Sequence, residues 1–159
     1  MDEVFEALDK LKIKYKVFNH QAVYTVEEAD NLNLEIDGNT NKSLFLRNSK
    51  GNNHYLVLMN GKKKMDIVKL QNLLNETRLS FASPERLLKY LKLTPGSVSP
   101  FGLINDVNHE VNVVVDTQLL NYKTLAFHPN INTQTLSLEI EDFKKYLEST
   151  GNKISYLEL

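Results

Sequence analysis

Short apolar runs recur along this chain, separated by longer segments whose apolar residues repeat at the spacing of an α-helix. The runs at residues 42–47, 54–59 and 111–115 have the length and the side chains of β-strands. The intervening segments, such as the one that follows Pro84, place apolar residues on one helical face. Strands that alternate with helices predict an α/β domain in which a mixed β-sheet is flanked by helices.

The same pattern predicts a single domain over residues 1–159. No linker or internal repeat interrupts the chain, and its length suits one hydrophobic core. Capping patterns mark helix starts at Thr25 and at Ser83 followed by Pro84, and a further helix follows Asp66. The remaining predicted elements are a first helix from Asp2, strands at residues 12–17, 123–128 and 133–138, and a last helix that ends at Gly151.

Hydrophobic residues make up 42% of the chain and charged residues 25%, which is the balance of a globular protein. No apolar stretch is long enough to span a bilayer, and the acidic N-terminus lacks the basic start of a signal peptide. The chain has no cysteine, which excludes disulfides, thiolate metal sites and thiol nucleophiles. We therefore expect a cytoplasmic protein with no membrane partner.

A net charge of −1 provides no global attraction for nucleic acid. A polyanion would therefore have to bind a local basic patch. The densest group of lysines is either such an RNA-contacting patch or a solvated turn and helix face, and it consists of Lys62, Lys63, Lys64 and Lys69.

The common phosphate-binding, dinucleotide-binding, zinc-protease and serine-hydrolase motifs are all missing from the sequence. The four histidines, at positions 20, 54, 109 and 128, lack the spacing of metal ligands. The sequence therefore predicts neither a metal nor a cofactor.

Three polar or glycine-bearing segments interrupt the apolar strands, and each has two interpretations. Lys42 begins a strand, where a lysine is either a solvated edge residue or a cation that faces a cleft and holds a phosphate or an oxyanion. Residues 96–102 form either a structural turn or a loop whose backbone N–H groups approach a ligand. His128 is either a structural residue or a site residue whose direction is fixed by Pro129.

Taken together and in this order, the segments resemble the YbaK/ProX family of prolyl-tRNA editing domains, which are homologous to the editing insertion of bacterial prolyl-tRNA synthetase. The resemblance runs through residues 20–29, 42–47, 54–58, 93–106 and 127–133. Its most specific part is Pro-Gly-Ser-Val-Ser-Pro-Phe-Gly-Leu at residues 95–103. That block is closer to the ProX branch, which removes alanine from tRNA(Pro), than to the YbaK branch, which removes cysteine. The resemblance implies the YbaK fold, also found associated with aminoacyl-tRNA synthetases, with a partly barrel-like sheet.

This family hydrolyses the ester that joins a wrong amino acid to the 3′-terminal adenosine of tRNA(Pro), without a metal or a covalent protein nucleophile. The resemblance implies two catalytic residues: Lys42 as an electrostatic anchor for the terminal nucleotide, and Gly102 in the loop that positions the ester carbonyl and water. It also implies a substrate-binding set that shapes the amino-acid pocket: Ser97, Val98, Ser99, Phe101, His128, Asn132 and Thr133.

The expected activity is trans-editing of alanine-charged tRNA(Pro), with prolyl-tRNA synthetase as a further expected partner. An aminoacyl ester is already activated, so orientation and carbonyl polarisation supply much of the rate. A small pocket excludes proline by size. The alternatives are a deacylase for Cys-tRNA(Pro) or another small residue, and a non-catalytic module that senses aminoacyl-tRNA or a free amino acid. Asn130 departs from the family's usual pattern, which leaves the choice of amino acid open.

Overall fold

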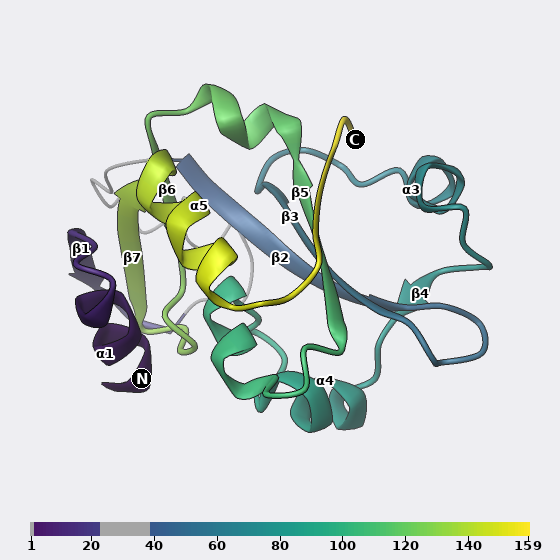
Figure 1. Ribbon diagram of the computed structural model, residues 1–159, viewed down its shortest axis with the longest axis horizontal. Coiled ribbons are helices and arrows are strands. Elements are labelled where there is room, and N and C mark those ends of the chain that lie inside the picture. Colours follow the sequence, from purple (N-terminus) through teal and green to yellow (C-terminus); the bar gives the residue numbers. More distant parts are fainter. Residues whose placement is uncertain (1, 23–38) are drawn as a thin grey trace.

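The computed structural model describes residues 2–22 and 39–159, and its centre is a mixed β-sheet of eight strands (Figure 1). The helix predicted from Thr25 lies outside the described residues. The strands are β1 (Tyr15–Asn19), β2 (Asn39–Arg47), β3 (His54–Asn60), β4 (Ser80–Phe81), β5 (Val111–Asp116), β6 (Thr124–Phe127), β7 (Gln134–Glu139) and β8 (Ile154–Leu157). The helices are α1 (Asp2–Lys10), α3 (Ile67–Leu74), α4 (Pro84–Leu91) and α5 (Ile140–Ser149), with 3₁₀ turns η1 (Pro100–Asn105) and η2 (Thr117–Asn121).

The strand order is β1-β7-β6-β2-β3-β5-β8, and the short β4 pairs with β2 outside this path. The pairs β2–β3, β6–β7 and β1–β7 are antiparallel, whereas β2–β6, β3–β5 and β5–β8 are parallel. This confirms the predicted mixed sheet. The sheet is not closed into a barrel, because β1 and β8 stand at opposite ends of the strand order and do not pair with each other.

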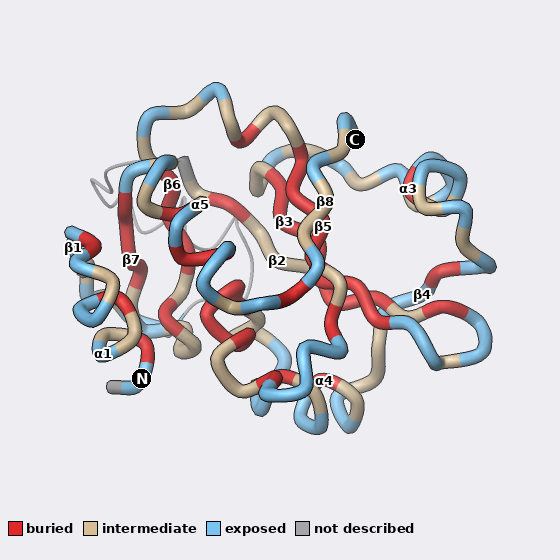
Figure 2. Tube along the Cα trace, in the orientation of Figure 1, coloured by how far each residue is buried: buried red, intermediate tan, exposed pale blue. Residues whose placement is uncertain are grey.

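Helices α1, α4 and α5 pack on one face of the sheet and form the main core with it. Their buried side chains meet the strand residues Phe45, Leu56, Leu125 and Leu136 in one cluster. Helix α3 packs on the opposite face at β3 and β5, around Leu70 and Val57, and lies far from α1 (Figure 1). Figure 2 shows the buried residues along the central strands and the exposed outer sides of the helices.

Side-chain caps begin two of the helices where the sequence predicts them. The Asp66 carboxylate accepts the Lys69 backbone N–H at the start of α3, and the Ser83 hydroxyl accepts the Arg86 N–H at the start of α4. At the end of α5, Gly151 has a φ of +79°, the left-handed conformation expected after a helix C-terminus.

Two differences from the predicted elements have identifiable physical causes. The first strand begins at Tyr15 rather than residue 12, because Lys12 takes a φ of +58° in the turn after α1. Strand β8 was not predicted, since its four residues acquire strand structure by parallel pairing with β5. Among the described helices, none is long and apolar enough to cross a membrane.

Candidate functional site

The site begins where the parallel strands β2 and β6 separate. Their pairing covers only Asn39–Leu125 and Thr40–Ala126. Lys42 and His128 each lie two residues beyond the last of these pairs, past the point where the strands separate. Beyond the last pair, β2 runs on beside β3, and the chain after β6 turns away at Pro129. In α/β sheets such a divergence at the carboxyl ends of parallel strands is where ligands bind.

Side chains on the two faces of this region differ in polarity. Phe127 and Leu136 point into the main core, so the neighbouring Thr135 and Ser137 lie on the opposite face. Both are buried, with 6% and 4% of their surface exposed. The same alternation places Lys42 on this face, which we call the polar face. The sequence analysis missed Thr135 and Ser137, although polar residues that alternate with leucines in a strand were a usable signal.

His128 is fixed as a neutral ring with one free acceptor direction. Its Nδ1 lies 3.0 Å from the carbonyl oxygen of Gln134 and donates to it, because a carbonyl can only accept. The Nε2 of the neutral ring is then an acceptor. Burial lowers the pKa of His128, the Gln134 hydrogen bond partly opposes this, and the nearby His20 lowers the pKa further.

A second histidine, His20, lies beside the first, and the two ring centres are 6.3 Å apart. Its backbone N–H donates to the carbonyl of Thr133 at 2.9 Å. Its Nδ1 donates to the carbonyl of Gln21 at 2.7 Å, which leaves Nε2 to accept the Thr135 hydroxyl at 2.9 Å. His20 therefore joins the end of β1 to the polar face of β7, a role that the sequence analysis did not assign.

The predicted glycine loop is bonded to the residue that follows β6. The buried Ser99 hydroxyl accepts the Phe101 N–H at 3.0 Å and donates to the carbonyl of His128 at 2.6 Å. Asn130 donates from its side chain to the carbonyl of Phe101 at 3.3 Å. The φ of Asn130 is +67°, a conformation that asparagine tolerates better than leucine. Asparagine therefore suits the backbone at this position.

The backbone N–H groups of this loop differ in whether they have a hydrogen-bond acceptor. The N–H groups of Val98 and Ser99 have no acceptor among residues 2–22 and 39–159. The N–H of Gly102, by contrast, donates to the carbonyl of Ser99. A Cβ on Gly102 would lie 2.7 Å from the Leu93 side chain, so close packing is what requires glycine here. The structure thus gives Gly102 a packing role and no N–H for a ligand, contrary to the expectation that its backbone approaches the ester.

Lys42 is half-buried, and its ammonium donates to the carbonyl of Lys63 in the turn after β3. Burial lowers the pKa of Lys42. In the part of the chain that the structure describes, no carboxylate lies within ion-pair distance of it. The ammonium is a directed cation with no carboxylate partner there, which fits the cleft-facing interpretation rather than that of a solvated edge residue.

Comparison with known proteins identifies the family. A model of the aminoacyl-tRNA editing domain matches residues 20–146. The chain belongs to the aminoacyl-tRNA editing domain family. The resemblance found in the sequence is confirmed, and with it the class of activity, an aminoacyl-tRNA deacylase.

Individual relatives of this editing domain match over almost its whole length. Prolyl-tRNA editing protein ProX of Acetoanaerobium sticklandii is 46% identical over 98% of this chain and 95% of its own. Prolyl-tRNA synthetase associated domain-containing protein 1 of Mus musculus is 30% identical over 94% of this chain and 90% of its own. A solved structure described as a candidate trans-editing enzyme for prolyl tRNA synthetase is 26% identical, with a TM-score of 0.66 over 91% of this chain and 87% of its own.

The other predicted site residues of the editing domain are placed as follows. Ser97, Val98 and Asn132 are half-buried, and Phe101 is fully buried in the main core. The side chain of Thr133 is exposed, and its carbonyl accepts the N–H of His20. Hydrogen bonds thus join the loop to His128 and Thr133 to His20, whereas Phe101 serves the core.

The predicted basic cluster is not uniform. Lys62, Lys64 and Lys69 are exposed. Lys63 instead forms an ion pair of 2.8 Å with Asp116, whose side chain is 1% exposed. A contact between the exposed lysines and RNA stays a prediction, and Lys63 is already neutralised.

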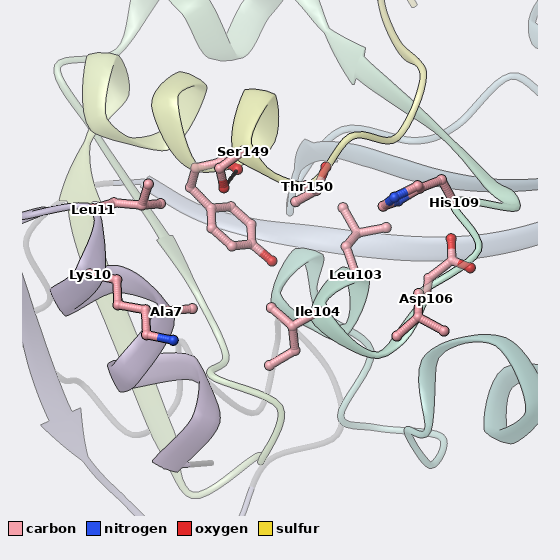
Figure 3. A pocket seen from close by; sticks show the side chains of 11 residues that line it. Ala7, Lys10, Leu11, Leu103, Ile104, Asp106, His109, Ser149 and Thr150 are labelled. Atoms are coloured by element: carbon pink, nitrogen blue, oxygen red, sulfur yellow. Dashed lines mark hydrogen bonds between the residues drawn. The ribbon is translucent and has the colours of Figure 1, made fainter.

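A separate groove of about 440 Å³ lies between α1, η1 and α5 (Figure 3). None of the predicted site residues lines it. Its buried carboxylate, Asp106, accepts the N–H groups of Glu110 and Val111 and the side chain of Asn152. The Tyr146 hydroxyl donates to the carbonyl of Pro100. These groups are used by the fold, so the groove has no set of polar groups directed at a ligand. The described residues also contain no cluster of metal-ligating side chains.

Proposed function

We propose that this protein is a trans-editing hydrolase that removes alanine from mischarged tRNA(Pro). The 46% identical relative is a prolyl-tRNA editing protein, which supports tRNA(Pro) as the substrate. The observation that carries the proposal is the placement of the Lys42 ammonium. It is held by a backbone carbonyl just beyond the separation of β2 and β6, without a described carboxylate in range.

The Lys42 charge suits an anionic or developing anionic group of the substrate. A cation without a carboxylate partner attracts the terminal phosphate of the tRNA or the oxyanion formed when water attacks the ester. The free N–H groups of Val98 and Ser99 are donors for the ester carbonyl. The Nε2 of His128 accepts a hydrogen bond from the α-ammonium of the aminoacyl group. A ribose hydroxyl of the substrate can orient the water, so the reaction needs no protein base.

The polar face favours a small aminoacyl side chain. Ala126, Thr135 and Ser137 are small, and each has less than a tenth of its surface exposed. If the aminoacyl group binds against these residues, their small size suits alanine, and exclusion of the larger proline would act as the second sieve of an editing reaction. Size alone does not separate alanine from glycine or serine, so part of the selectivity comes from the tRNA.

A deacylation time course on Ala-tRNA(Pro), Cys-tRNA(Pro) and Pro-tRNA(Pro) tests the proposal. We expect rapid loss of alanine while proline stays attached. Loss of cysteine instead would support the same ester hydrolysis with Cys-tRNA(Pro) as the substrate. Survival of all three esters would contradict the proposal and favour a non-catalytic module that senses aminoacyl-tRNA.

We also propose that the reaction takes place in the cytoplasm, with tRNA(Pro) as the bound partner and prolyl-tRNA synthetase nearby. Co-purification with tagged synthetase, repeated after ribonuclease treatment, tests whether that association is direct. Loss of the association on ribonuclease treatment would show that tRNA is the only link.

A further inference from the structure

Asp116, at the end of β5, is a buried carboxylate with every oxygen occupied. Its Oδ2 lies 2.8 Å from the ammonium of Lys63. Its Oδ1 accepts the backbone N–H groups of Gln118 at 3.2 Å and Leu159 at 3.5 Å. Because these partners come from η2 and the C-terminus, Asp116 is fixed by the fold and provides a rigid point of attachment for Lys63.

Lys63 belongs to the turn that follows β3 and folds back on the start of β2. The N–H of Gly61 donates to the carbonyl of Thr40 at 3.0 Å, and the N–H of Lys63 donates to the carbonyl of Asn60 at 3.1 Å. The carbonyl of Lys63 faces β2 and accepts the Lys42 ammonium. One residue thus contacts Asp116 through its side chain and Lys42 through its backbone.

We infer that Lys63 and Asp116 are positioning residues for Lys42, with Asp116 fixing the turn through the Lys63 side chain and the Lys63 carbonyl directing the Lys42 ammonium. The inference rests on the proposed function, in which Lys42 contacts the substrate.

Two substitutions that change the charge in opposite directions distinguish this positioning role from a direct contact between Lys63 and RNA. Lys63→Met removes a positive charge and Asp116→Asn removes a negative one, so the two changes shift the attraction for RNA in opposite directions. If Lys63 served RNA binding, Asp116→Asn would strengthen it. If the pair positions Lys42, both changes lower kcat, because each breaks the same connection.

The experiment measures kcat and KM on Ala-tRNA(Pro) for Lys63→Met, Asp116→Asn and the double variant. We expect each single variant to lower kcat about tenfold, as a modest misplacement of a catalytic group does. The double variant should be no slower than the slower single variant, because coupled residues are not additive. Lys64→Met removes one charge from the same turn and reports the effect of charge alone. Lys144→Met, which breaks the exposed pair with Glu141, is the matched ion-pair control and should leave kcat unchanged.

An NMR signal of the Lys42 ammonium, assigned by its loss in Lys42→Ala, gives a readout that does not depend on activity. It should shift or broaden in Lys63→Met and Asp116→Asn and stay in place in Lys144→Met. If kcat and the NMR signal were unchanged in both variants while Lys42→Ala was inactive, the positioning role would be refuted and the proposed function would stand. Full activity of Lys42→Ala would overturn the proposed function instead.

Discussion

His54 makes the stability of the fold depend on pH between about 4 and 6.5. Its side chain is buried, with 2% of the residue exposed, and its ring stacks between Phe45 and Tyr90 at centre distances of 5.5 and 4.1 Å. Arg86 lies 3.1 Å from its Nε2 and donates to it. Burial, followed by the charges of Arg86, Arg47 and Lys89, lowers the pKa of His54 from 6.5 to about 4.

This direction of shift determines the sign of the effect. In the unfolded chain the imidazole binds a proton below about pH 6.5, whereas in the folded protein it stays neutral down to about pH 4. The stabilisation is complete above pH 6.5 and is lost as the pH falls to 4. Between pH 7.5 and pH 5 the contribution of His54 to the free energy of unfolding falls by about 2 kcal/mol.

Urea unfolding of the wild type and of His54→Phe at pH 7.5 and pH 5 measures this effect. Phenylalanine keeps the ring stack and removes the titration, and the contributions of other groups, including His128, cancel in the comparison. The wild type should lose about 2 kcal/mol more than the variant over this interval, with the same dependence on urea concentration. An equal loss in both proteins would refute the reasoning.

Three further predictions follow from local contacts. Gly102→Ala places a Cβ against Leu93 and should lower the free energy of unfolding by about 1–3 kcal/mol in a urea titration; an unchanged value would contradict the packing role. Burial alone would raise the pKa of Glu76, but hydrogen bonds from Tyr55 and other donors lower it to about 2. The stabilisation by Glu76 is therefore lost as the pH falls from 4.5 to 2. Glu76→Gln should make the melting temperature depend less steeply on pH over this range. An equally steep dependence in the variant would contradict the role of Glu76. Ser99→Ala removes both the η1 cap and the hydrogen bond to the His128 carbonyl. It should lower the free energy of unfolding by about 1 kcal/mol and raise KM for Ala-tRNA(Pro) by a factor that corresponds to a larger free energy. An unchanged KM would show that Ser99 does not serve the site.

Most of the fold is predictable because its signals are local. Residues 42–47, 54–59 and 111–115 carry strand patterns, and Ser83 is a capping residue next to its helix. The short β8 is different, because its strand structure depends on pairing with β5. The open shape of the sheet is likewise a property of the whole strand order.

The site was predictable only in part, since its residues meet through tertiary structure. Taken singly, Lys42 and His128 each have an ordinary structural interpretation, and only the parallel pairing of β2 and β6 brings together the two strands that precede them. The Lys63–Asp116 pair joins segments distant in sequence, so the run of lysines in the turn predicted either a basic patch or a solvated surface and gave no sign of the ion pair. Gly102 shows the opposite case, in which a glycine assigned to catalysis is required by packing.

The most direct test of the account is single-turnover deacylation of Ala-tRNA(Pro) by Lys42→Ala, with Lys144→Ala as the control. Lys42→Ala should lose hydrolysis, while its free energy of unfolding falls by no more than about 1 kcal/mol, the amount expected from the lost hydrogen bond to the Lys63 carbonyl. Lys144→Ala should match the wild type in both measurements. Hydrolysis by Lys42→Ala at the wild-type rate would contradict the assignment of this site.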